Sequence, residues 1–133
     1  MASIRKETVV AASPDHVWSA LRDVGALHRR LAPGFVVDCR LEGDTRTVTF
    51  ANGMTVRERI VDIDDAGRRV AWSVIGDPFT HHNASAQVLP ADGGGSRFVW
   101  IADLLPDELA PTVDALMGQG IDVIRQTMEQ AGG

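Results

Sequence analysis

The sequence predicts an α+β fold in which a curved antiparallel β-sheet of about seven strands wraps around a long C-terminal α-helix. The stretch from Asp107 to about Gln130 has a helical pattern, because apolar residues recur there every three or four positions: Leu109, Val113, Leu116, Met117, Ile121, Ile124 and Met128. Residues 35–104 instead form short alternating segments separated by turns, which is typical of an antiparallel meander. Such a sheet must bury one face, and the apolar stripe of the helix can pack against that face.

The first part of the chain is predicted to form one strand and two short helices. Ile4–Ala11 reads as the strand. Ser13-Pro14-Asp15 then indicates a helix start, because a hydroxyl N-cap, a proline at the first position and an acid in the first turn all favour one. Gly25 breaks this helix, and Ala26–Leu31 is predicted to be the second, stopped by Pro33-Gly34.

The meander is predicted to contain six further strands, which are Phe35–Glu42, Thr45–Ala51, Met54–Asp64, Arg68–Ile75, Thr80–Leu89 and Arg97–Leu104. Asn52-Gly53 is the strongest hairpin signal, because both positions tolerate a positive φ. The sequence contains no repeat and no linker, so a single domain over residues 1–133 is expected.

Two glycines, Gly118 and Gly120, interrupt the middle of the predicted C-terminal helix. Each costs roughly 1 kcal/mol relative to alanine in a helix interior. Their missing side chains either let another group come close to the helix or mark a kink or a tight strand crossing.

Composition narrows the classes of partner and the cellular setting. The formal net charge is −5, and no basic cluster exceeds two adjacent arginines, which argues against nucleic acid or an anionic membrane as the main partner. No apolar run approaches the roughly 20 residues of a membrane-spanning helix, and the first residues lack the apolar core of a signal peptide. Cys39 is the single cysteine, which is compatible with a reducing compartment, so a cytoplasmic location is expected. Small-molecule and protein partners remain open, and the oligomeric state is not predicted.

Three stretches of the chain carry a resemblance to a known family. Ser13-Pro14-Asp15-His16-Val17-Trp18 is similar to an "SPxxVW" opening helix, and residues 56–65 (VRERIVDIDD) are similar to an "xxERLxxLDD" strand and turn. The strands from Arg69 to Asn83 and from Ser96 to Trp100 complete the match. The chain thus resembles the START-like (SRPBCC, Bet v 1-like, helix-grip) superfamily, in particular its small bacterial polyketide cyclase/dehydrase-like members. That resemblance implies a cavity between sheet and helix, in a fold that hosts carriers, sensors and enzymes.

The middle of the chain also resembles the plant abscisic-acid receptors of the same superfamily. In those receptors a gate loop and a latch loop cover the pocket, and the resemblance places their equivalents at Asn52–Thr55 and Asp77–His82. The proline-bearing gate sequence of the receptors is absent here, and Lys6 is the only lysine, so the receptors' pocket lysine has no counterpart. The resemblance therefore implies movable loops over a pocket for a ligand other than abscisic acid.

Glu58 is the first candidate for a functional side chain. Strand alternation puts it on one face with Val56 and Ile60, so it points toward the helix if they do. An acid in an apolar pocket has its charged form disfavoured, which suits a proton donor or base near neutral pH. The matching glutamate of the receptors lines the pocket. The opposite register would leave Glu58 exposed and paired with an arginine across the hairpin.

His81 and Asp103 are the other candidates for proton transfer. Neighbours on a strand point to opposite faces, so only one of His81 and His82 can face the pocket, and the family match places His81 inside, near the mouth. Its ordinary pKa suits proton transfer or a hydrogen bond to a ligand, whereas the alternative is a structural histidine. Asp103 follows Val99 and Ile101 on one alternating face, and its direction stays open because the opposite face is apolar too.

The remaining candidates would line the cavity. The expected ligand-binding residues are Val56, Glu58, Trp72, Val74, Phe79, His81, Met117, Ile121 and Ile124, some of which must be plain core. The sequence has no glycine-rich phosphate loop, no HExxH, no CxxC and no serine-nucleophile elbow. The histidines also lack metal-ligand spacing, so neither a metal nor a cofactor is predicted.

Two functions are compatible with these residues. The first is a carrier or sensor that binds a small, largely hydrophobic molecule (aromatic, polyketide or lipid-like) in the cavity. The alternative is a polyketide cyclase-, aromatase- or dehydratase-type enzyme in which Glu58, His81 or Asp103 moves protons next to a carbonyl. A protein-interaction role with a vestigial pocket is the third possibility. Convergence of Glu58 and His81 within hydrogen-bond reach would favour the enzyme, and an isolated polar group would favour binding.

Overall fold

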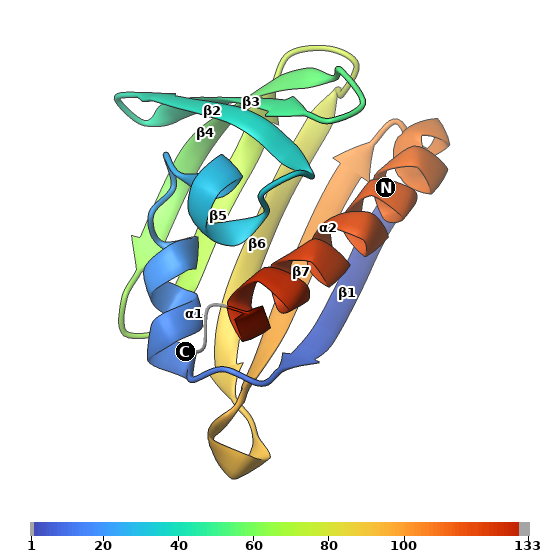
Figure 1. Ribbon diagram of the computed structural model, residues 1–133. Helices are drawn as coiled ribbons and strands as arrows, with labels where there is room; N and C mark the ends of the chain where they lie inside the picture. The colour runs from blue at the N-terminus through green and yellow to red at the C-terminus, as the bar shows by residue number, and fades with distance from the viewer. Residues whose placement is uncertain (1, 131–133) are drawn as a thin grey trace.

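A seven-stranded antiparallel sheet with the spatial order β1-β7-β6-β5-β4-β3-β2 forms the framework (Figure 1). The computed structural model describes residues 2–130, so residues 1 and 131–133 of the expected domain lie outside it. The strands are β1 Ala2–Val10, β2 Val36–Glu42, β3 Thr45–Phe50, β4 Thr55–Asp64, β5 Arg69–Ile75, β6 His81–Pro90 and β7 Ser96–Leu105. Each predicted strand is present, with ends displaced by at most two residues.

The helices also follow the predicted order. Ser13 caps α1 (Pro14–Leu21), since its hydroxyl accepts a hydrogen bond from the His16 N–H at 3.2 Å. The second short helix is a π-helical turn, η1 (Leu27–Leu31), and a 3-10 turn, η2 (Asp92–Gly94), joins β6 to β7. The predicted C-terminal helix begins as a 3-10 turn, η3 (Asp107–Leu109), before α2 (Ala110–Gln130). No helix within residues 2–130 combines the length and hydropathy needed to cross a membrane.

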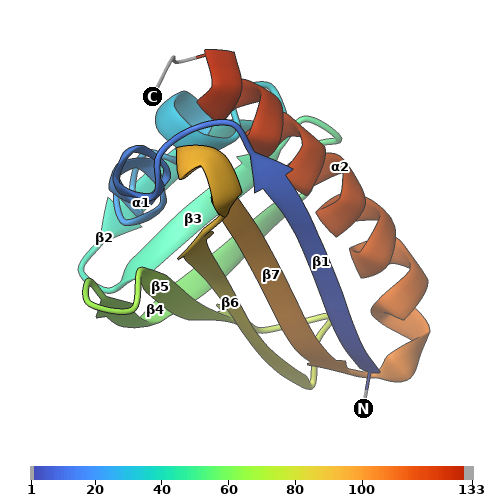
Figure 2. The same cartoon turned by 90° about the horizontal axis from the view of Figure 1, so that it is seen from below.

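The sheet curves around α2, as the two views in Figures 1 and 2 show. The helix packs mainly along β1, and α1 and η1 lie beside its C-terminal half. Its buried residues are Met117, Gly120, Ile121, Ile124 and Met128, which belong to the predicted stripe apart from the glycine. The predicted α+β helix-grip fold is therefore confirmed.

Two aromatic side chains lie close to the helix at Gly120. A Cβ atom at this position would lie 2.9 Å from Phe35 Cε2 and 3.0 Å from Trp100 Cζ3. A Cβ atom at Gly118 would meet nothing within 4 Å. The close approach expected for this pair thus occurs at Gly120 alone.

We expect opposite effects from alanine at these two glycines. Gly118→Ala should raise the free energy of unfolding by up to about 1 kcal/mol, because helix propensity improves and nothing is displaced. Gly120→Ala should lower it by about 1–3 kcal/mol, because the rings of Phe35 and Trp100 must both move to make room for the new Cβ atom. Urea unfolding followed by circular dichroism measures both, and a stabilising Gly120→Ala would contradict the packing argument.

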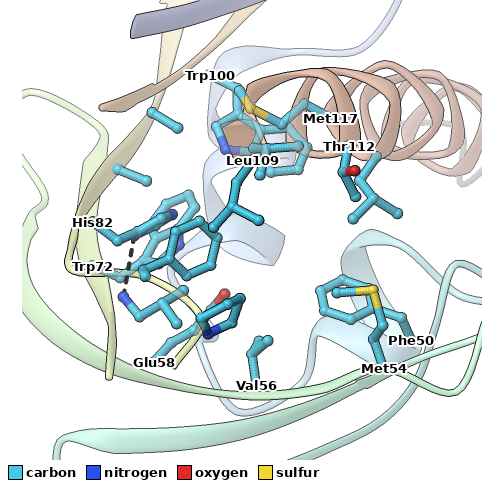
Figure 3. Close-up of a pocket in the computed structure, with 17 residues that line it drawn as sticks. Phe50, Met54, Val56, Glu58, Trp72, His82, Trp100, Leu109, Thr112 and Met117 are labelled. Carbon is cyan, nitrogen blue, oxygen red and sulfur yellow. Dashed lines mark hydrogen bonds between the residues drawn. The ribbon is translucent and has the colours of Figure 1, made fainter. Parts of the chain in front are cut away.

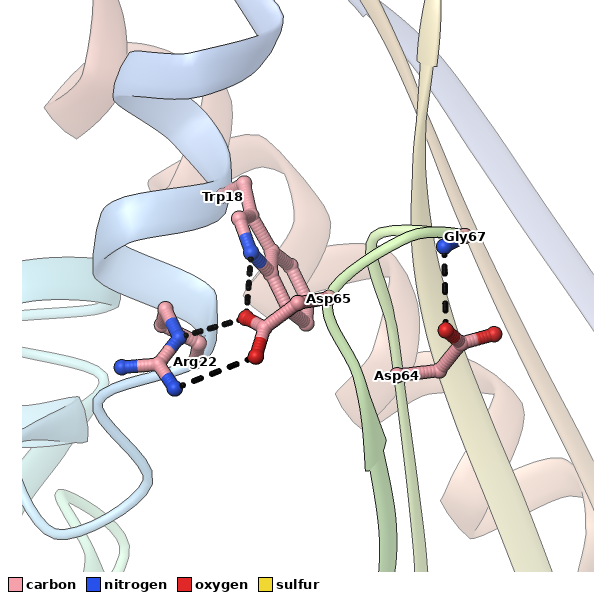
Figure 4. Close-up of polar contacts among 5 residues, drawn as sticks. All are labelled: Trp18, Arg22, Asp64, Asp65 and Gly67. Carbon is pink, nitrogen blue, oxygen red and sulfur yellow. Dashed lines mark hydrogen bonds and ion pairs between the residues drawn. The ribbon is translucent and has the colours of Figure 1, made fainter.

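Two of the three motifs that carry the family resemblance contact one another (Figure 4). Trp18 Nε1 of α1 donates to Asp65 Oδ1 in the β4–β5 turn at 3.1 Å, and Arg22 Nε donates to the same oxygen at 2.8 Å. Asp64, the neighbouring acid, accepts from the Gly67 N–H at 3.1 Å and so shapes the turn. Asp65 therefore ties the first helix to the sheet, although it is exposed.

This contact should make stability depend on pH at acidic values. The hydrogen bond from Arg22 holds the pKa of Asp65 below its ordinary value of 3.8, with Trp18 adding to the effect. The stability that the charged Asp65 contributes to the fold is present above pH 3.8 and is lost as pH falls through the lower pKa of the folded state. Asp65→Asn should reduce the melting temperature more at pH 7 than at pH 2, whereas Asp62→Asn on the exposed strand surface should leave the melting temperature unchanged at both pH values. Equal losses for Asp65→Asn at both pH values would contradict the assignment.

Candidate ligand cavity

A cavity of about 130 Å³ lies between α2 and the inward faces of β4, β5, β6 and β7 (Figure 3). Most of its lining is apolar: Phe50, Met54, Val56, Trp72, Val74, Pro78, Phe79, Ala84, Trp100, Ala102, Leu109, Val113, Leu116 and Met117. Three polar side chains, Glu58, His82 and Thr112, interrupt it. Within residues 2–130 no group of three His, Cys, Asp or Glu side chains is placed to hold a metal ion.

Most residues expected around a ligand lie in this wall. Val56, Glu58, Trp72, Val74, Phe79 and Met117 line the main cavity. Ile124 lines a separate inner hollow, and Ile121 is a buried core residue that lines neither space. Met54, from the stretch that resembles a gate, and Pro78 and Phe79, from the latch-like stretch, lie in the cavity wall. Their roles in binding stay predictions.

Glu58 points inward and is also paired with an arginine. It faces Arg46 across the β3–β4 hairpin, and Arg46 Nε donates to Glu58 Oε1 at 2.7 Å. The two side chains are 4% and 10% exposed, respectively. Arg46 Nη1 also donates to the Val24 carbonyl at 3.2 Å, and its guanidinium lies 5.2 Å from the ring centre of Trp72. Glu58 thus has the inward orientation that the sequence favoured, together with the cross-hairpin arginine that the sequence associated only with an exposed Glu58.

His82, not His81, is the inward histidine of β6, which corrects the sequence interpretation. His81 is exposed on the outer face, whereas His82 lines the cavity. The alternation of β6 indicated this orientation, because Ala84, Ala86 and Val88 share the inward face of His82, while Asn83 and Gln87 lie on the other face.

The surroundings of His82 fix its protonation state. Its Nδ1 accepts a hydrogen bond from the Val74 N–H at 3.1 Å (Figure 3), and its ring meets Phe79 edge to face with centroids 5.0 Å apart. Burial lowers the pKa of His82 below 6.5, although the charge of Glu58 acts in the opposite direction. The ring is therefore neutral near pH 7 with its proton on Nε2, which is a hydrogen-bond donor.

Asp103, whose direction the sequence left open, is also on the outer face and so does not line the main cavity. Its Oδ1 accepts from the Ser3 hydroxyl at 2.6 Å, and it shares a shallow surface hollow with His81. The inward positions of β7 belong instead to Phe98, Trp100 and Ala102. Consequently neither His81 nor Asp103 shares the main cavity with Glu58.

An inner hollow of about 60 Å³ lies beyond the main cavity, toward α1 and η1. The two spaces have four lining residues in common, namely Phe50, Glu58, Trp72 and Trp100. Trp72 and Trp100 are tilted 51° to each other with centroids 6.4 Å apart. Three aromatic rings and one carboxylate thus border both spaces.

The fold and this cavity can be compared with known proteins. Residues 1–129 match the family described as polyketide cyclase / dehydrase and lipid transport. The chain belongs to this family. The resemblance expected from its three motifs is thereby confirmed.

Several solved structures have the same architecture as this family member. XoxI from Bacillus cereus aligns at a TM-score of 0.88 and 20% identity, over 100% of this chain and 99% of that one. A START superfamily protein from Mycobacterium smegmatis aligns at a TM-score of 0.73 and 14% identity, over 97% of this chain and 95% of that one. Norcoclaurine synthase from Thalictrum flavum aligns at a TM-score of 0.74 and 20% identity, over 98% of this chain and 86% of that one. Such identities show the fold alone, and no curated protein matches the sequence.

Proposed function

We propose that the protein binds a small, uncharged, largely apolar molecule in the main cavity, as a carrier or sensor in the cytoplasm. The observation that supports this proposal is a largely apolar cavity with few polar groups, among them a hydrogen-bond acceptor on Glu58 and a donor on His82. Its volume of about 130 Å³ is close to that of an engineered cavity of ~150 Å³ that binds benzene, so one aromatic ring is a suitable body for the ligand. The cytoplasmic location fits the buried Cys39, whose thiol pKa is raised by burial.

Two polar atoms would orient the ligand. Within residues 2–130 Glu58 Oε1 is bonded to Arg46, and no group donates a hydrogen bond to Glu58 Oε2. His82 Nε2 likewise has no partner in that part of the chain, while its Nδ1 is occupied. A hydroxyl group can donate to the first atom and accept from the second. Arg46 neutralises Glu58, so a charged ligand gains little attraction that would offset its loss of hydration.

The alternative, a cyclase-, aromatase- or dehydratase-type enzyme, would use Glu58 as base and His82 as proton donor. It is favoured by the presence of both side chains in one cavity wall. However, Glu58 and His82 make no hydrogen bond to each other, and each is held by another group. Binding therefore needs fewer assumptions than catalysis.

Phenol and toluene provide a test, because they have the same number of heavy atoms and differ in the hydroxyl. Calorimetric titration should show phenol binding more tightly than toluene. Glu58→Gln should weaken phenol about tenfold, because a charged acceptor becomes neutral, while toluene changes by less than threefold. Native mass spectrometry of the purified protein would in addition report any apolar molecule that co-purifies. Failure of both probes to bind would overturn the proposal.

A further inference from the structure

The inner hollow suggests a more specific ligand than the main cavity does alone. We propose that the ligand is a hydroxylated aromatic ring with a short apolar chain next to the hydroxyl, and that this chain occupies the inner hollow. The inference rests on the proposed function, since it assumes that the ring lies in the main cavity.

The position of Glu58 sets the geometry of this ligand. Glu58 lines both spaces, so a hydroxyl bonded to its Oε2 lies where the two spaces meet. A chain can enter the inner hollow from there only if it is attached close to the hydroxyl. A chain on the far side of the ring would point instead toward Met54 and Phe79 at the gate-like and latch-like stretches.

The inner hollow limits the length and the polarity of the chain. If benzene fits a cavity of ~150 Å³, a hollow of about 60 Å³ has room for roughly two or three carbon atoms. Its wall is formed by aliphatic and aromatic side chains apart from Glu58 and Arg46, which are bonded to each other. The chain should therefore be an unbranched hydrocarbon.

Positional isomers test the geometry without changing hydrophobicity. We expect 2-propylphenol to bind at least tenfold more tightly than phenol, because each buried methylene contributes about a three- to fourfold gain. The isomer 4-propylphenol should bind at least tenfold more weakly than 2-propylphenol. Equal affinities for the two isomers would overturn the inference, whereas failure of both phenol and toluene to bind would overturn the proposed function.

Two buried alanines provide matched variants. Ala86 lines only the inner hollow, and Ala102 lines only the main cavity; both are 1% exposed, on neighbouring strands. Ala86→Val should remove the advantage of 2-propylphenol and leave phenol within twofold, whereas Ala102→Val should weaken both. An unchanged preference in Ala86→Val would place the chain elsewhere. If a variant does not fold, the isomer comparison in the unmodified protein still decides the question.

Discussion

Replacing Arg46 with methionine is expected to lower the free energy of unfolding by about 3–5 kcal/mol, the range found when one partner of a buried ion pair is removed. Methionine keeps much of the side-chain volume, so the loss comes from leaving the Glu58 carboxylate without its counter-charge in an apolar wall. The bond to the Val24 carbonyl and the contact with Trp72 are lost as well. Urea unfolding at pH 7 measures the change.

Two comparisons isolate the ion pair in this experiment. Arg59→Met, on the exposed face of β4, should change stability by less than about 0.5 kcal/mol, because it is a surface position. The double variant Arg46→Met/Glu58→Leu should recover most of the loss, since a buried pair can be replaced by apolar residues at little cost. A double variant as unstable as Arg46→Met would show that packing, not charge, accounts for the loss.

The fold could be predicted from the sequence because its signals are local. The Ser13 cap, the turn at Asn52-Gly53 and the stripe from Leu109 to Met128 each depend on residues a few positions apart. The direction of Glu58 followed from the same local alternation, with Val56 and Ile60 on its face.

The polar partners in the cavity depend on strand register and were harder to predict. Arg46 reaches Glu58 only because the β3–β4 hairpin sets them opposite each other. Its place on the face of buried Val48 was nevertheless a readable sign that it points inward. Asp103 could not be placed, because both faces of β7 are apolar and the decision depends on which one α2 covers.

The histidine error has a different origin. The family match favoured His81, whereas the alternation of β6 favours His82 through the small residues Ala84 and Ala86. These alanines leave space beneath α2, so the inward histidine projects into a cavity and not into packed core. The local pattern was the better guide here, because a family match that is displaced by one residue along a strand assigns every side chain to the opposite face of the sheet.

The binding of phenol should depend on pH through His82. The pKa of this histidine lies below 6.5 because of burial, while the charged groups around it (Glu58 and Asp103, which raise its pKa, and His81, which lowers it) act more weakly than burial. Protonation would put a hydrogen on Nδ1, which could then no longer accept from the Val74 N–H. The neutral, binding-competent ring is therefore lost as pH falls through the lowered pKa, and folding stability falls in the same direction.

Phenol affinity should accordingly stay constant from pH 8 to 6.5 and then fall, by up to about tenfold per pH unit once His82 is protonated. His82→Asn is the informative variant, because its amide oxygen can still accept from the Val74 N–H while the Nε2 donor and the titration are absent. At pH 8 it should bind phenol about two- to tenfold more weakly, since one neutral hydrogen bond is missing. The phenol affinity of His82→Asn should not change over the same pH range. A slope that persists in His82→Asn would show that His82 is not the titrating group, and a flat profile in the unmodified protein would remove His82 from the binding site.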